Sequence, residues 1–459
     1  MKTGSRESDS ASNGAAGNVD RLSRRVADLY ASDTQFRCAE PNPAVIEAAC
    51  RPGLRLAPAL RTLVEGYADR PALGQRARDL AVDAGTGRTT ARLLPRFDTI
   101  SYRDLWSRVS AIASAWRHTS VHPLNPGDFV ATVGFASPEF LIVDLVCAYL
   151  GLVSVPLQHN ASVSQLSRMI SEVEPRAIAV SAEYLGLAFA STLNNASLRT
   201  LVVFDYQPEV DDHRENLEAA RRRLHDAGAP VVIETLGEVV ERGKTLPPEP
   251  VYTAGTDQRL AMILYTSGST GTPKGAMYTE RMLAELWTAP FLQSETPVIN
   301  VNFMPLNHLG GRLALVASFL AGGTSYFVAE SDLSTLFDDW ALVRPTQMTV
   351  VPRVVDMLFQ QYRSVVDRHV AEGEKPVNAE AQAAADLRGK LLGGRVLGGF
   401  VGTAPLSDEM KVFLDSCLDV HIGDGYGLTE VGIVTRDTVV TRPPVIDYKL
   451  VDVPELGYF

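Results

Sequence analysis

The sequence has 459 residues, a formal net charge of −11, 46% hydrophobic residues and 21% charged residues. A chain of this length exceeds what one hydrophobic core usually organises, so we expect two or three subdomains of a globular protein. The negative net charge gives no general electrostatic support for binding nucleic acid, and we expect no nucleic-acid partner.

Four cysteines are scattered along the chain without C-x-x-C spacing, namely Cys38, Cys50, Cys147 and Cys417. This pattern predicts neither a zinc site nor a disulfide framework, and it fits the reducing cytoplasm. Residues 1–20 are polar and lack the apolar run of a signal peptide, so we expect a disordered tail there.

The longest apolar stretch, "FLIVDLVCAYLGLVSVPL" (Phe140–Leu157), is the only segment that suggests a membrane span. It contains Asp144 and ends in β-branched residues that are typical of a strand. A buried helix followed by a buried strand explains this stretch better, and we expect no membrane insertion.

Short apolar runs alternate with segments of helical periodicity. A helix is predicted to begin at Pro138 with Ser137 as its N-cap, and another to cover Ser162–Val173. The predicted strands are Asp128–Phe135, Leu152–Leu157, Ala177–Ser181, Leu198–Tyr206, Val301–Leu306, Thr324–Ala329, Gln347–Pro352 and Arg395–Gly402. This alternation predicts βαβ units, a mostly parallel sheet and the α/β fold class.

Two further segments divide the chain. "PPEPVYTAGTD" (Pro247–Asp257) is typical of a linker between two halves of similar size. Residues 364–390 are rich in Glu, Ala and Lys, which predicts a polar helical insertion or a hairpin of helices.

The apolar run "LAMIL" (Leu260–Leu264) leads into the stretch "LYTSGSTGTPKG", which ends at Gly275. Glycine lets backbone N–H groups approach a ligand closely, hydroxyls add donors, and Lys274 adds a positive charge. This combination suits phosphate oxygens. Because Lys274 lies between Pro273 and Gly275, the stretch does not match the pattern G-x-x-x-x-G-K-[ST]. The residues alone therefore predict either a phosphate loop of another type or an ordinary surface loop.

A second motif, "DGYGLTE" (Asp424–Glu430), contains groups that could act on a nucleotide. The aromatic ring of Tyr426 can stack on a base, and Thr429 can donate to a phosphate oxygen. Glu430 can ligate Mg²⁺, a hard cation that prefers oxygen ligands.

Position for position, "YTSGSTGTPKG" resembles the phosphate loop of the adenylate-forming superfamily, which includes acyl-CoA synthetases, luciferases and adenylation domains. "DGYGLTE" lies where that superfamily carries its second motif. A narrower resemblance covers about residues 21–459: "LLPRFDTISYRDLW", "GTPKGAMYTE" and "SDLSTLFDD" look like the adenylation domain of carboxylic acid reductases, multidomain enzymes that reduce acids to aldehydes. It implies a large domain with two βαβ-type subdomains (21–246 and 258–442) and the incomplete start of a β-barrel (443–459).

The resemblance implies ATP-dependent activation of a carboxylic acid to an acyl-adenylate, with release of pyrophosphate. It assigns catalytic roles to His308, Lys274 and Glu430, with Glu430 as the Mg²⁺ ligand. Thr403 stands in place of the family's usual serine and keeps the hydroxyl. The implied nucleotide contacts are Thr266, Ser267, Gly268, Ser269, Thr270, Gly271, Lys274, His308, Thr403, Asp424, Gly425, Tyr426 and Thr429.

In the resembled family the chain continues beyond the second motif. It adds a ribose-binding Asp, a small C-terminal subdomain with a catalytic Lys, a carrier domain in cis with a phosphopantetheine arm, and an NADPH-binding reductase domain. None of these is visible after Glu430, so we expect a truncated adenylation core. Two alternatives remain: a fatty-acyl-CoA or acyl-AMP ligase core, and a non-catalytic ATP-binding remnant.

Overall fold

The computed structural model describes residues 21–192, 195–266, 273–442 and 445–454. It divides into two compact units: the first comprises the described residues up to Met348 together with Ala385–Leu397, and the second comprises Thr349–Ala384 and the described residues from Gly398 on. The tail predicted to be disordered and the glycine-rich centre of the phosphate loop (267–272) lie outside the described residues.

The first unit contains a seven-stranded sheet in the order β7-β6-β5-β3-β4-β8-β9. All neighbouring strands are parallel except β8 and β9, which form an antiparallel hairpin. The strands are β3 (Phe129–Val133), β4 (Val153–Leu157), β5 (Ala177–Ser181), β6 (Thr200–Phe204), β7 (Val232–Thr235), β8 (Leu260–Thr266) and β9 (Lys274–Thr279). The predicted α/β class and parallel sheet are confirmed.

Helices connect the parallel strands, as βαβ units require, and α5 (Tyr102–Arg117) leads into the first of them from β2 (Thr89–Ser101) of a second sheet. The connecting helices are α6 (Pro138–Leu150), α7 (Val163–Val173), α8 (Leu185–Thr192), α9 (Asp211–Asp226) and α10 (Leu236–Lys244), with a short 3₁₀ turn, η1 (Ala182–Tyr184). The predicted cap is present, because the Ser137 side chain accepts a hydrogen bond from the Phe140 N–H in the first turn of α6. The helix predicted over Ser162–Val173 begins one residue later, at Val163, and Ser162 is its N-cap. Buried α6 followed by buried β4 confirms the interpretation of Phe140–Leu157. Within the described residues, none of the helices combines the length and apolar character that crossing a bilayer requires.

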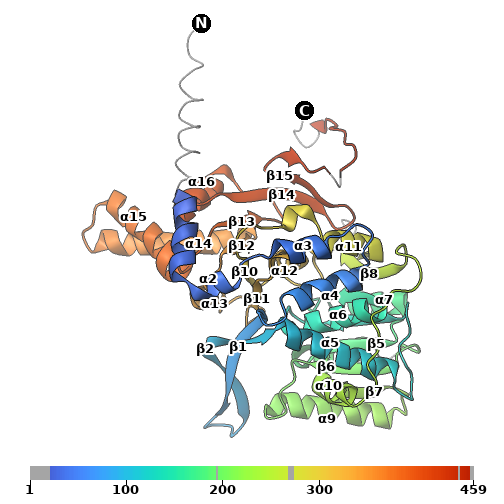
Figure 1. The fold of residues 1–459 in the computed structure, drawn as a ribbon. Helices are drawn as coiled ribbons and strands as arrows, with labels where there is room; N and C mark the ends of the chain where they lie inside the picture. Colours follow the sequence, from blue (N-terminus) through green and yellow to red (C-terminus); the bar gives the residue numbers. More distant parts are fainter. Residues whose placement is uncertain (1–20, 193–194, 267–272, 443–444, 455–459) are drawn as a thin grey trace. The chain divides into compact units, whose positions relative to one another are not determined.

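A four-stranded sheet in the order β10-β11-β1-β2 completes the first unit. Its strands are β1 (Pro71–Val82), β2 (Thr89–Ser101), β10 (Ile299–Asn302) and β11 (Thr324–Phe327). The β1–β2 hairpin projects from this sheet (Figure 1). Its tip is held to α9 by Arg88, whose guanidinium pairs with Asp212 at 2.6 Å and Glu215 at 2.8 Å.

Further helical elements belong to this unit, and α12 (Leu309–Ala321) connects β10 to β11. The others are residues 21–32, α2 (Thr34–Cys38), α3 (Pro43–Ala49), α4 (Leu56–Gly66), α11 (Glu280–Trp287), α13 (Leu336–Val343), the 3₁₀ turn η2 (Pro290–Leu292) and the π-helical turn η3 (Leu387–Leu391). Side chains from both sheets and from α4, α5, α6 and α12 share one hydrophobic core.

The prediction of a strand over Val301–Leu306 is wrong in its bounds, because β10 ends at Asn302. The side-chain amide of Asn302 accepts the Met304 N–H at 3.2 Å, and Pro305 has no N–H to offer a neighbouring strand. Residues 303–308 therefore form a turn that leads into α12.

The segment Pro247–Asp257 contains neither helix nor strand. It is packed on the first unit, since Tyr252 N–H donates to the Tyr149 carbonyl at 2.8 Å and the Tyr149 hydroxyl donates to the Glu249 carbonyl at 2.6 Å. The predicted subdomain boundaries on either side of it stay predictions.

The second unit holds a five-stranded sheet in the order β12-β13-β14-β15-β16, with β12 at the boundary between the units. The elements are β12 (Gln347–Val350), α14 (Pro352–Ala371), α15 (Pro376–Asp386), β13 (Gly398–Val401), α16 (Asp408–Leu418), β14 (Ile422–Leu428), β15 (Gly432–Arg436) and β16 (Val439–Val440). Helices α14 and α15 pack through Val366, Ala379 and Ala383. Of the two alternatives predicted for residues 364–390, the structure has a pair of helices, but the first helix begins earlier, at Pro352.

The strand predicted at Arg395–Gly402 begins later, at Gly398. Arg395 is buried, and its guanidinium binds the Val343 carbonyl at 2.5 Å and the Asp33 carboxylate at 3.1 Å. These contacts hold Arg395 in place before β13 begins.

The described residues form open sheets and no closed barrel. Residues 445–454 expose apolar surface, since Ile446 is 90% and Leu450 is 87% exposed, and Val451 is also largely exposed. Such a strip is a candidate for association with other apolar surface.

One buried carboxylate anchors the open end of the β8–β9 hairpin. Glu280, 1% exposed, binds Arg55 Nε at 2.8 Å and Arg259 Nε at 2.7 Å. Glu280→Ala leaves two arginines without their counter-charge, so we expect the free energy of unfolding to fall by about 3–5 kcal/mol in urea titrations. Glu285→Ala on the same helix is the control, because its pair with Arg281 is exposed and should contribute less than about 1 kcal/mol. Equal losses in both variants would contradict this assignment.

Candidate functional site

The phosphate-loop motif occupies the β8–β9 hairpin of the first unit. Thr266 ends β8 and pairs with Lys274, the first residue of β9 and an exposed cation. Just before the loop, the Tyr265 hydroxyl donates to the Glu172 carboxylate at 2.9 Å. Burial and the Glu172 charge raise the pKa of Tyr265, so the hydroxyl keeps its proton. Tyr265 thus fixes the start of the loop to α7. Ser267, Gly268, Ser269, Thr270 and Gly271 lie outside the described residues.

His308 is the N-cap of α12 on the same unit. Its Nδ1 accepts the Gly310 N–H at 3.1 Å, so the proton of the neutral ring lies on Nε2. The residue is exposed, but protein atoms crowd part of the ring, and this desolvation lowers the pKa of His308. At neutral pH the side chain therefore presents one N–H donor from the end of a helix.

In the second unit, Asp424 lies on β14 within a charged cluster. Lys411 of α16 pairs with its carboxylate at 2.6 Å, and this contact raises the pKa of Lys411. The Asp424 N–H donates to Asp437 Oδ1 at 3.0 Å. Burial raises the pKa of Asp437, but this N–H and His421, 3.2 Å from its other oxygen, outweigh burial and leave it lowered. Asp437 thus holds the backbone of Asp424, and Lys411 holds its side chain.

The glycines of the second motif permit close packing of strands. A Cβ on Gly425 would lie 2.4 Å from Phe400 Cζ and 2.7 Å from the Thr435 carbonyl oxygen. Tyr426, beside it, is 56% exposed, so its ring is open to a stacking partner. Thr429 and the exposed Glu430 form the turn between β14 and β15.

Thr403 follows β13 with a φ of +76°, a left-handed conformation that β-branched residues rarely adopt. Strain of this kind costs about 1–3 kcal/mol and is common at functional sites. The residue is exposed, and the Gly402 N–H before it is bound to the Val350 carbonyl at 3.1 Å. This constrained turn presents the Thr403 hydroxyl to solvent.

The structure thus groups the described site residues in two sets, one on each unit. The first set is Thr266, Lys274 and His308; the second is Thr403, Asp424, Gly425, Tyr426, Thr429 and Glu430. Over the described ranges, no three His, Cys, Asp or Glu side chains form a group that could hold a metal ion. A single carboxylate, Glu430, still fits Mg²⁺, which proteins bind through one or two carboxylates together with phosphates.

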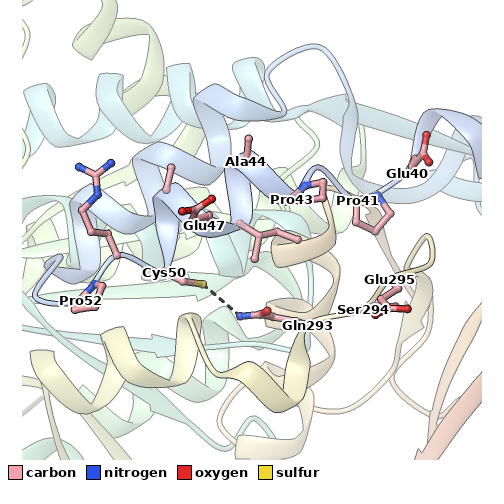
Figure 2. Close-up of a pocket in the computed structure, with 13 residues that line it drawn as sticks. Glu40, Pro41, Pro43, Ala44, Glu47, Cys50, Pro52, Gln293, Ser294 and Glu295 are labelled. Atoms are coloured by element: carbon pink, nitrogen blue, oxygen red, sulfur yellow. Dashed lines mark hydrogen bonds between the residues drawn. The ribbon is translucent and has the colours of Figure 1, made fainter.

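A groove of about 1120 Å³ lies on the first unit, between α3 and Gln293–Glu295. Figure 2 shows the side chains that line it. Gln293 Nε2 lies 3.5 Å from the Cys50 sulfur along its wall. None of the described residues of either set lines this groove, so it is separate from the candidate site.

Sequence reasoning missed Lys411, Asp437 and Glu172, which hold the motif residues in place. Each comes from an element outside the motifs it supports, so residue order gives no signal for it. Asp437 does lie at the turn between β15 and β16, where its φ of +47° is typical of Asp in a tight hairpin.

The family model and the curated relatives agree on the kind of protein that this chain resembles. The family model described as AMP-binding enzyme matches residues 69–458. A carboxylic acid reductase from Mycobacterium tuberculosis is 51% identical over 447 residues, covering 96% of this chain and 38% of that protein. One from Mycobacterium marinum is 48% identical over 446 residues, again covering 96% of this chain and 38% of that protein. The chain thus spans 38% of the length of these curated relatives.

Two solved adenylation domains of carboxylic acid reductases share the fold. The domain from Segniliparus rugosus, in complex with AMP and a co-purified carboxylic acid, is 46% identical with a TM-score of 0.89; the match covers 95% of this chain and 70% of that one. The domain from Mycobacterium chelonae is 48% identical with a TM-score of 0.91, over 96% of this chain and 68% of that one.

The packing around Phe400 predicts a difference between two glycines. Gly425→Ala places a methyl group against the Phe400 ring and an immobile backbone carbonyl, so we expect about 1–3 kcal/mol of destabilisation from overpacking. Gly402→Ala is the control, since its Cβ would meet the same ring at 3.5 Å, an ordinary contact. Urea unfolding of both variants measures the difference, and a stable Gly425→Ala would refute the crowding.

Proposed function

We propose that this chain, which belongs to the AMP-binding enzyme family and within it to the carboxylic acid reductase adenylation domains, activates a carboxylic acid with ATP. The observation that supports this most is its 46% identity to a domain solved with AMP and a carboxylic acid. In the proposed reaction, a carboxylate oxygen forms a bond to the α-phosphorus. The bond from that phosphorus to the pyrophosphate oxygen breaks, pyrophosphate leaves, and an acyl-adenylate remains.

The set on the first unit acts on the anionic groups. Lys274 and the loop before it neutralise the β- and γ-phosphates, whose charge grows as pyrophosphate leaves. The Nε2–H of His308 donates a hydrogen bond on the carboxylate and α-phosphate side, as a neutral donor. Because α12 is a rigid element, this donor is positioned before the substrate arrives.

The set on the second unit acts on the nucleoside and the metal. Tyr426 stacks on the adenine, the hydroxyls of Thr403 and Thr429 donate to the adenylate, and Asp424 with Gly425 contacts it from β14. Glu430 would hold Mg²⁺. When bound, this ion supplies positive charge to the phosphate oxygens.

The later steps belong to the whole protein. We propose that a carrier domain in cis takes the acyl group on a phosphopantetheine arm, and that an NADPH-dependent domain reduces it to the aldehyde. A solved relative from Segniliparus rugosus contains an A-PCP didomain in complex with AMP. A cytoplasmic location is part of the proposal, supported by four free cysteines.

Lys274→Ala tests the phosphate contact. A hydrogen bond to a charged group contributes about 1.5–3 kcal/mol, so we expect nucleotide binding or pyrophosphate release to fall roughly ten- to a hundredfold. Isothermal calorimetry and a pyrophosphate assay measure the two effects. Lys244→Ala is the control, because Lys244 is an exposed cation paired with Glu241. If both variants keep full nucleotide binding and turnover, Lys274 is not a phosphate ligand.

Acid-dependent pyrophosphate release tests the function itself. It is measured on this chain and on a longer form, in which the part of the Segniliparus rugosus adenylation domain that this chain does not match is joined to its C-terminal end. The resembled family supplies a catalytic lysine from its C-terminal subdomain, so we expect slow release by this chain and recovery in the longer form. Thioester formation with free CoA would favour the acyl-CoA ligase alternative. Nucleotide binding without acid-dependent release in either form would favour the non-catalytic alternative.

A further inference from the structure

The turn that carries His308 is tied to α12 by one buried amide. Asn302, 2% exposed, donates from Nδ2 to the Gly311 carbonyl at 3.0 Å and accepts the Met304 N–H on Oδ1 at 3.2 Å. One side chain therefore joins the start of the turn to the first turn of the helix. His308 lies between these two attachment points in sequence.

The turn and the helix lie too close together for independent movement. A Cβ on Gly311 would lie 2.7 Å from both the Met304 and the Pro305 carbonyl oxygens. The His308 N–H donates to that same Pro305 carbonyl at 3.0 Å. A shift of Met304 or Pro305 is therefore transmitted directly to the backbone of His308.

Helix α12 itself is held by a contact with α6. Arg312, in the first turn of α12, pairs with Asp144 of α6 at 2.7 Å, and both side chains are buried. With α12 held, the turn of residues 303–308 is the part whose position depends on Asn302.

We propose that Asn302 is the positioning residue for His308: its amide sets the turn so that the imidazole accepts the Gly310 N–H and directs its Nε2–H outward. This inference rests on the proposed function for its effect on catalysis. The effect of Asn302 on the His308 imidazole can be measured by a method that does not depend on enzyme activity.

Asn300 provides a matched control. It lies on the same strand, is 4% exposed, and also uses both amide atoms: Nδ2 donates to the Ala314 carbonyl at 2.8 Å and Oδ1 accepts the Ser325 hydroxyl at 2.7 Å. These partners lie beyond the first turn of α12 and in β11. Asn300→Ala therefore removes a comparable buried amide without touching the His308 turn.

The first measurement is ¹⁵N NMR of the histidine rings in the full chain, with the His308 signal assigned from His308→Ala. We expect a neutral ring with its proton on Nε2 in the parent and in Asn300→Ala. In Asn302→Ala the Gly310 contact is lost, so we expect a mixture of both neutral tautomers. An unchanged His308 signal in Asn302→Ala would overturn the proposal. Asn302→Ser, whose hydroxyl cannot span both partners, replaces the alanine variant if the latter does not fold.

The second measurement is acid-dependent pyrophosphate release per folded molecule. A misplacement of about 1 Å can lower a rate about a hundredfold, so we expect a roughly ten- to hundredfold lower kcat in Asn302→Ala. We expect little change in the KM for ATP and near-parental values in Asn300→Ala. Equal activity of the two asparagine variants would contradict the positioning role. Full activity of His308→Ala would instead contradict the proposed role of His308, while the NMR result would still decide what Asn302 does.

Discussion

The first unit depends on a buried ion pair, Arg312 with Asp144, which crosses the core shared by its two sheets. Arg312 comes from α12, which follows a strand of the four-stranded sheet, and Asp144 from α6, which covers the seven-stranded one. Ser154 of β4 donates to the same carboxylate at 2.5 Å. Charges in a low-dielectric core must be paired, because removal of one partner leaves the other uncompensated. This requirement locks α12, and with it the helix end that carries His308.

Paired side chains also hold the segments of the candidate site, both in the core and near the surface. Glu280 compensates two arginines at the open end of the β8–β9 hairpin, and Tyr265 is bound to Glu172 at the loop end. In the second unit, Asp424 is held by Lys411 and Asp437. The exposed candidate site groups thus lie on segments whose buried or half-buried neighbours are paired. This arrangement favours preorganised donors over flexible ones.

Local patterns in the sequence predicted much of the fold. Ser137 was predicted as an N-cap because the cap and the helical periodicity after it lie within a few residues of each other. Elements that depend on distant partners could not be predicted in this way. The β1–β2 hairpin is held at its tip by α9, more than a hundred residues away, and β10 ends early because the Asn302 amide takes up the next donor.

In the candidate site, too, the sequence predicted local features but not those that depend on distant partners. The order of residues around Lys274 and Asp424 identified the two motifs, since each motif consists of consecutive residues. The positive φ of Thr403 and the charge partner of Asp424 are consequences of packing, so no sequence pattern revealed them. The motif residues alone did not reveal which neighbouring residues hold them in place.

In the proposed reaction, a carboxylate oxygen attacks the α-phosphorus of ATP. Transfer of oxygen-18 from the acid to AMP tests this step. The chain is incubated with ATP, Mg²⁺ and a panel of carboxylic acids labelled with oxygen-18 in the carboxylate, with hydroxylamine present to attack the carbonyl carbon of any acyl-adenylate. Mass spectrometry then examines the AMP. We expect AMP that carries one oxygen-18 atom from the acid. Unlabelled AMP or ADP, formed equally with and without acid, would contradict it.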